Sequence, residues 1–73
     1  MSFLVYDTAN EQIETCGAIQ EAIAWVESRL QAEESRGRKV EREGKGRWAI
    51  YGNEAIDLVW IEDAQGSVVS FAR

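Results

Sequence analysis

The stretch RWAIYGNEAIDLVWIE, residues 47–62, decides the fold because it contains two apolar runs separated by a turn signal. Both runs are rich in β-branched and aromatic residues, which are typical of strands. The connection Gly52-Asn53 is the kind of two-residue sequence that forms a tight hairpin. We therefore expect two antiparallel strands, over residues 47–51 and 55–62.

Alternation along these strands sorts the apolar side chains into two sets, one on each face of a sheet. With Gly52-Asn53 as the turn, Tyr51 would pair with Glu54. The first set, which we expect to form the core with Val69 and Phe71, is Ala49, Tyr51, Ile56, Leu58 and Trp60. The second set, with Val68 as a further candidate, is Trp48, Ile50, Val59 and Ile61.

The rest of the chain predicts one helix and further strands. Residues 3–7 and 12–16 have strand-forming patterns on either side of a turn, so we expect a hairpin, with an irregular lead into the helix as the alternative for 12–16. Gly17 is a candidate N-cap, and Gly37 can end the helix in the left-handed conformation. Trp25 lies off the apolar stripe of this helix, which has helical spacing and consists of Ile19, Ala22, Ile23, Val26 and Leu30.

These elements predict a small α+β fold with the order β-β-α-β-β-β, in which one amphipathic helix crosses one face of an antiparallel sheet. Residues 67–72 are expected to be the last strand, after a turn, and 40–43 could add a short edge strand. We expect a single domain over 1–73, with a basic, glycine-containing loop at 36–47.

The composition argues against an enzyme. The chain has 73 residues, no histidine and one cysteine, so the commonest general base and metal ligand is missing and no intrachain disulfide can form. The adjacent acids Glu33-Glu34 and Glu62-Asp63 are expected to point apart, so they do not form an acid/base dyad. No calcium-loop spacing is present, and Cys16 is expected to be a small buried residue. We expect no catalytic residue, cofactor or metal. The absence of a long apolar run or a signal peptide predicts a cytoplasmic protein without membrane contact.

The net charge of -5 conceals a division along the chain. Residues 36–47 contain six basic and two acidic side chains, which gives +4, while the other residues carry two basic and eleven acidic side chains, which gives -9. This segment could contact nucleic acid or an acidic protein patch. Alternatively, its basic side chains compensate the negative charges of Glu33 and Glu34 at the C-terminal end of the helix. The residues concerned are Arg36, Arg38, Lys39, Arg42, Lys45 and Arg47.

The second apolar set predicts an interface, because one helix cannot cover both faces of the sheet. Its partner could be another protein or a second copy of the chain. Internal cover by the first hairpin or the basic loop is the alternative. The predicted partner-binding residues are Trp48, Ile50, Val59, Ile61, Asp57 and Asp63. The acidic surface could mimic a phosphate backbone, although solubility is the favoured explanation for it.

The sequence therefore favours a non-enzymatic protein that binds another macromolecule. The leading hypothesis is that the chain is a small protein-binding inhibitor or adaptor. Size and composition are typical of inhibitors encoded by phages and mobile elements, including anti-CRISPR proteins, which is analogy at the level of composition. The alternative is a nucleic-acid-binding accessory protein that uses residues 36–47, which the acidic body disfavours.

Overall fold

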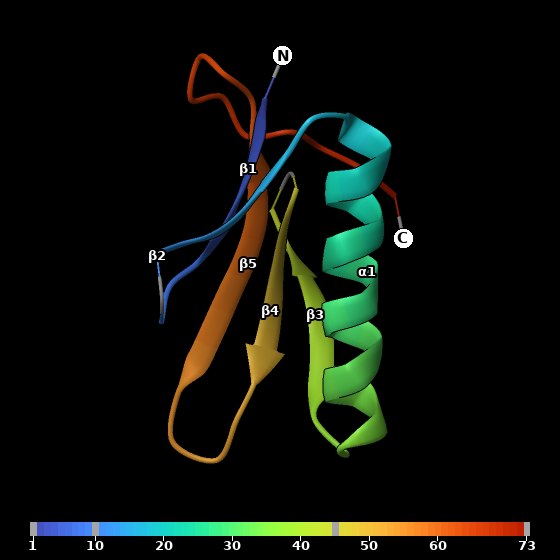
Figure 1. Ribbon diagram of the computed structural model, residues 1–73. Coiled ribbons are helices and arrows are strands. Elements are labelled where there is room, and N and C mark those ends of the chain that lie inside the picture. The colour runs from blue at the N-terminus through green and yellow to red at the C-terminus, as the bar shows by residue number, and fades with distance from the viewer. Residues whose placement is uncertain (1, 10, 45, 73) are drawn as a thin grey trace.

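The computed structural model describes residues 2–9, 11–44 and 46–72 (Figure 1). One helix, α1, runs along one face of an antiparallel sheet, so the expected α+β fold is confirmed. The element bounds are β1 (Phe3–Asp7), β2 (Glu11–Cys16), α1 (Ile19–Ser35), β3 (Lys39–Glu43), β4 (Arg47–Tyr51) and β5 (Ile56–Glu62).

The sheet has five strands in the order β2-β1-β5-β4-β3. The hairpin of β1 and β2 joins the meander of β3, β4 and β5 through antiparallel pairing of β1 with β5. This arrangement places β5 at the centre and leaves β2 and β3 as edges. The edge strand β3 confirms the possible edge strand at 40–43, and it takes up part of the segment that we expected to be a basic loop.

The helix follows the predicted stripe. Ala22, Val26 and Leu30 are fully buried, while Ile19 and Ile23 pack at the margin of the core. The helix is capped by the extended backbone of Ala18 rather than by Gly17, so the predicted N-cap is wrong by one residue. At the other end Gly37 has φ 82°, the left-handed conformation that we expected there.

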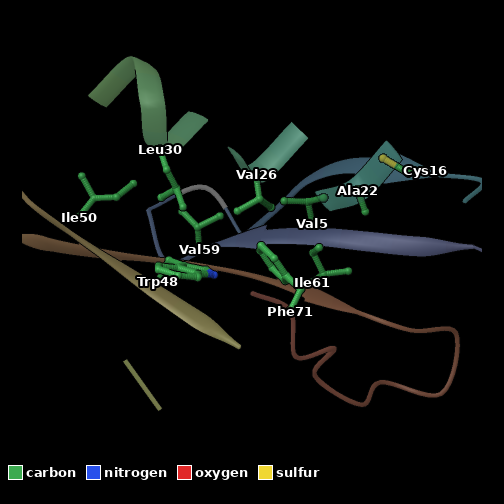
Figure 2. Close-up of a cluster of buried hydrophobic side chains, with 10 residues drawn as sticks. All are labelled: Val5, Cys16, Ala22, Val26, Leu30, Trp48, Ile50, Val59, Ile61 and Phe71. Atoms are coloured by element: carbon green, nitrogen blue, oxygen red, sulfur yellow. The ribbon is translucent and has the colours of Figure 1, made fainter. Parts of the chain in front are cut away.

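The hydrophobic core lies between α1 and the face of the sheet that we expected to be uncovered (Figure 2). Within residues 47–62 the predicted sorting of side chains into two sets is confirmed, but the choice of the face under the helix is wrong. Val69 and Phe71, which we expected with the first set, pack with the second. Both sets are apolar, and alternation alone cannot say which one the helix covers. The residues that line the covered face are Val5, Trp48, Ile50, Val59 and Ile61.

The connection between β4 and β5 is longer than predicted. Tyr51 pairs with Ile56, and a loop of residues 52–55 replaces the expected two-residue turn. Gly52 N–H donates to the Ala55 carbonyl at 2.9 Å and closes this loop. The register therefore moves by two residues, which preserves the face on which each side chain lies.

The C-terminal segment, residues 67–72, folds back along β5 without forming the expected strand. It makes one bridge, between Val68 and Glu62, and Val69 N–H donates to the Ile61 carbonyl at 2.8 Å. The chain then crosses toward α1, and Phe71 enters the core (Figures 1 and 2). The Phe71 ring centroid lies 5.9 Å from that of Trp48, so this segment closes one end of the core.

Candidate protein interface

On the face of the sheet turned away from α1, which we call the open face, three neighbouring rows of side chains lie across the strands, and a further row of Leu4 and Glu62 lies beyond the first. Residues that pair across antiparallel strands share a face, so the register of the sheet defines each row. The first row is Tyr6, Trp60, Arg47 and Glu43. The middle row is Leu58, Ala49 and Glu41. The third row is Ile56, Tyr51 and Lys39.

The first row is a continuous stack. The rings of Tyr6 and Trp60 lie nearly parallel, with centroids 5.7 Å apart and an interplanar angle of 13°. The Arg47 guanidinium carbon lies 5.1 Å from the centroid of the Trp60 ring, within the range of a cation–π contact. Trp60 Nε1–H donates to a Glu62 carboxylate oxygen at 2.8 Å. These contacts bring two aromatic rings and a guanidinium together on the surface.

The third row is linked to the middle row by a polar cluster near the β3 edge. The Tyr51 hydroxyl donates to one Glu41 oxygen at 3.3 Å, and Lys39 Nζ lies 2.8 Å from the other. The hydrogen bond and charge of Lys39 lower the pKa of Glu41, and Glu41 raises the pKa of Lys39 in return. The negative charge of Glu41 raises the pKa of the Tyr51 hydroxyl. At neutral pH this cluster therefore contains a carboxylate, an ammonium and a protonated phenol.

The open face is apolar at its centre and charged at one margin. Ile56 is 56% exposed, Tyr6, Tyr51, Leu58 and Trp60 are half-buried, and Ala49 is covered by its neighbours. α1, the single helix in residues 2–9, 11–44 and 46–72, lies on the opposite side. Aromatic residues and arginine are enriched at the centres of protein interfaces. The composition of this face is therefore typical of a surface that binds protein.

The predicted partner-binding set must be corrected, because the structure buries its apolar members. Trp48 is 7% exposed, Ile50 1%, and Val59 and Ile61 0%, all beneath α1. Asp57 is half-buried on the same face, and Asp63 accepts hydrogen bonds from Gln65 N–H and Ser67 N–H within its own turn. The predicted apolar surface exists, but the first set of residues forms it.

The predicted basic contact residues are distributed over several separate contacts within the chain. Arg36 and Arg38 both pair with the buried Glu33, at 3.1 and 2.9 Å. The Arg42 guanidinium lies over Trp48 at 5.7 Å and donates to Ser70 Oγ at 3.0 Å. Lys39 pairs with Glu41, and Arg47 stacks on Trp60. Lys45 lies outside the described residues. The basic segment therefore does not form one patch of unpaired cations among the residues described.

Two hollows lie outside the open face. The first, about 530 Å³, runs along α1 beside the half-buried Trp25 and between the short side chains of Ala24 and Ser28. The second, about 420 Å³, lies between the end of α1 and the β4–β5 loop, with the Glu33–Arg38 pair in its wall. Both are open to solvent.

Cys16 is not placed for nucleophilic chemistry. It is 7% exposed, and burial, together with the negative charges of Glu14 and Glu21, raises its pKa. The protonated thiol is therefore the dominant form at neutral pH, whereas nucleophilic catalysis requires the thiolate. Within residues 2–9, 11–44 and 46–72 no three His, Cys, Asp or Glu side chains are grouped to hold a metal ion. In the same ranges no helix is long and apolar enough to cross a membrane.

Sequence reasoning missed Tyr6 and Glu62 as parts of the open face. Tyr6 comes from the first hairpin, and its place beside Trp60 depends on the pairing of β1 with β5, which no local pattern specifies. A usable signal was the amphipathic character of the first set. Tyr51 and Trp60 have polar atoms and share their face with Arg47, whereas three of the four members of the second set, all except Trp48, have aliphatic side chains.

Comparison of the chain with protein-family models, with curated proteins and with solved structures returned no match.

Proposed function

We propose that this chain is a non-enzymatic protein-binding protein that makes its contact through the open face of the sheet. The observation that supports this most directly is the row Tyr6, Trp60 and Arg47, fixed by stacking on a face that α1 does not cover. Rigid aromatic side chains and arginine contribute a large share of the binding energy at protein interfaces. The partner is a protein surface that is apolar at its centre and carries charges of both signs, to match the open face.

The alternative function, binding of nucleic acid, has less support. Such proteins neutralise phosphates with lysine and arginine side chains that are free to make the contact. Here Arg36, Arg38, Lys39 and Arg42 are occupied by contacts within the chain. The overall charge of -5 adds a general repulsion between the protein and phosphates.

Within protein binding, we favour an inhibitor or adaptor that acts stoichiometrically. The domain is small, and its distinctive surface is one face of a sheet rather than an enclosed cleft. Small inhibitors encoded by phages and mobile elements have this kind of construction, which is an analogy of architecture alone. The buried free thiol of Cys16 is compatible with a reducing compartment such as the cytoplasm.

Site-specific photo-cross-linking tests the proposal. A benzophenone amino acid replaces Leu58, at the centre of the open face, and in a matched control replaces Gln31, which is exposed on α1. The cross-linking is performed in host lysate, with and without nuclease, and adducts are identified by mass spectrometry. We expect one defined protein adduct from position 58, unchanged by nuclease and absent from position 31.

Three results would overturn the proposal. Adducts that contain nucleic acid, or that disappear with nuclease, would support the accessory-protein alternative. Equal adducts from both positions would show that contact is not confined to the open face. A defined adduct from position 31 alone would move the interface to α1.

A further inference from the structure

We infer that the open face binds a second copy of this chain, related by a two-fold axis that lies perpendicular to the strands and passes over the middle row of Leu58 and Ala49. This inference rests on the proposed function, since it names a second copy as the protein that the open face binds; a target protein would have to displace that copy from the same surface. Two observations support it. They are the order of the three rows and the signs of the charges at the β3 margin.

The geometry follows from the register. A two-fold axis perpendicular to the strands brings each strand opposite its own copy in the reverse direction. The first and third rows are then exchanged across the interface, and the middle row meets itself. Such an interface is isologous, so every contact occurs twice. Faces of stacked sheets lie about 10 Å apart, which allows side chains of both copies to interdigitate.

The apolar contacts that result are complementary. Trp60 of one copy meets Ile56 of the other, and Leu58 meets its own equivalent. Arg47, already held against Trp60, meets the ring of the partner's Tyr51, which allows a second cation–π contact. Ile56, the most exposed large apolar side chain described, becomes buried by this arrangement. Ala49 leaves room at the centre because its side chain is small.

The charges at the β3 margin also match. Lys39 is in the third row and Glu43 is in the first, so the axis places each Lys39 opposite the partner's Glu43. The side chain of Lys39 is 71% exposed and can reach across while remaining near Glu41. Glu41 meets its own equivalent, but Lys39 at 2.8 Å and the Tyr51 hydroxyl at 3.3 Å compensate its charge within each copy.

The other simple two-fold axis, parallel to the strands, is less favourable. It keeps each row opposite itself, so when it passes over β5 it brings Glu62 against Glu62 and leaves Lys39 and Glu43 without opposite charges. The pairing of Lys39 with Glu43 therefore distinguishes the two arrangements. It is also a contact that substitutions can reverse without changing the apolar centre.

Sedimentation equilibrium of the purified full chain, over a range of concentrations, tests the inference. The variants are Lys39→Glu, Glu43→Lys and the double exchange of both charges. We expect a wild-type dimer, and about a tenfold weaker association for Glu43→Lys because two attractive pairs become repulsive. Lys39→Glu should weaken association at least as much, because it also removes the compensation of Glu41. The double exchange should recover association to within about threefold of the wild type. Glu21→Lys, on the exposed side of α1, has the same charge change as Glu43→Lys and should leave association unchanged. Circular dichroism confirms that each variant is folded.

A monomeric wild-type protein at all concentrations would overturn the second-copy inference. The proposed function would still stand if position 58 captured a different protein in lysate. This axis would be excluded if neither single substitution changed the dissociation constant of the dimer. It would also be excluded if the double exchange did not restore that constant. A position-58 adduct of twice the mass of the chain would support both the proposed function and the second copy.

Discussion

Asp7, on β1, is an acidic residue whose side chain is completely buried. One carboxylate oxygen accepts a hydrogen bond from Ala9 N–H at 2.7 Å, and the other lies 2.7 Å from Arg29 Nη1 on α1. The pair connects the helix to the first strand. A buried ion pair need not be a net source of stability, but the loss of one partner leaves a buried charge without compensation.

We therefore predict that Arg29→Met lowers the free energy of unfolding by about 3–5 kcal/mol. The matched control is Arg36→Met, which should cost about 1 kcal/mol or less, because the side chain of Arg36 is 68% exposed and Glu33 retains Arg38. Urea denaturation measures both. Adding Asp7→Asn to Arg29→Met should restore part of the loss, since it removes the buried charge. Equal effects for the two arginine variants would contradict this account.

Cys16 provides a prediction about pH. Burial raises its pKa above the ordinary 9.0, so the folded chain holds the thiol proton more tightly than the unfolded chain does. Its contribution to stability is complete below pH 9 and is lost as the pH rises through the folded pKa. We expect slow reaction with iodoacetamide at pH 8, and fast reaction after denaturation in guanidinium chloride. Fast reaction of the native protein would show that the thiol is more accessible than its burial implies.

The C-terminal segment, residues 67–72, is the least regular element, yet it closes one end of the core. Phe71 packs on Trp48, whose indole N–H is buried without an acceptor among the described residues. Gly46 has φ 104°, and a Cβ atom there would lie 2.7 Å from the Val69 carbonyl oxygen. The close approach of this backbone to the start of β4 therefore requires glycine.

Gly46→Ala and Gly44→Ala form a matched pair, since both glycines have positive φ but a Cβ at Gly44 would meet nothing within 4 Å. Gly44→Ala should cost about 1–2 kcal/mol from backbone strain alone. Gly46→Ala should cost about twice as much, because it also displaces the C-terminal segment. Thermal denaturation measures the difference. In Gly46→Ala we expect Trp48 to become more accessible to an acrylamide quencher. Equal losses of stability would show that the segment does not depend on this contact.

Features that depend on residues close together in the sequence could be predicted from it. The stripe of Ala22, Val26 and Leu30 predicted the helix, and the alternation in 47–62 predicted which side chains share a face. The shift to Tyr51 opposite Ile56 and the irregular path of 67–72 could not be predicted in this way. They depend on loop closure and on packing against α1 and β5, which a local pattern does not record.

At the scale of the whole molecule, the sheet has two apolar faces and the described chain supplies one helix to cover them. The sequence showed this imbalance, and with it the prediction of an interface. It did not show which face α1 covers, because the packing of α1 against β5 depends on contacts between residues that are far apart in the sequence. The side-chain composition of the two faces differs in a way that accounts for the choice. The covered face is largely aliphatic, while the open face combines aromatic rings with Arg47 and the Lys39–Glu41 pair.

The central claim is that the open face binds protein and the opposite face forms the core. Leu58→Asp and Val59→Asp test it most directly, because these neighbours on β5 point to opposite faces and Val59 is 0% exposed. Circular dichroism and sedimentation velocity are measured on both variants. We predict that Leu58→Asp remains folded and loses self-association, while Val59→Asp loses its cooperative fold, since a carboxylate would be buried without a partner. A folded Val59→Asp variant together with an unfolded Leu58→Asp variant would contradict the account.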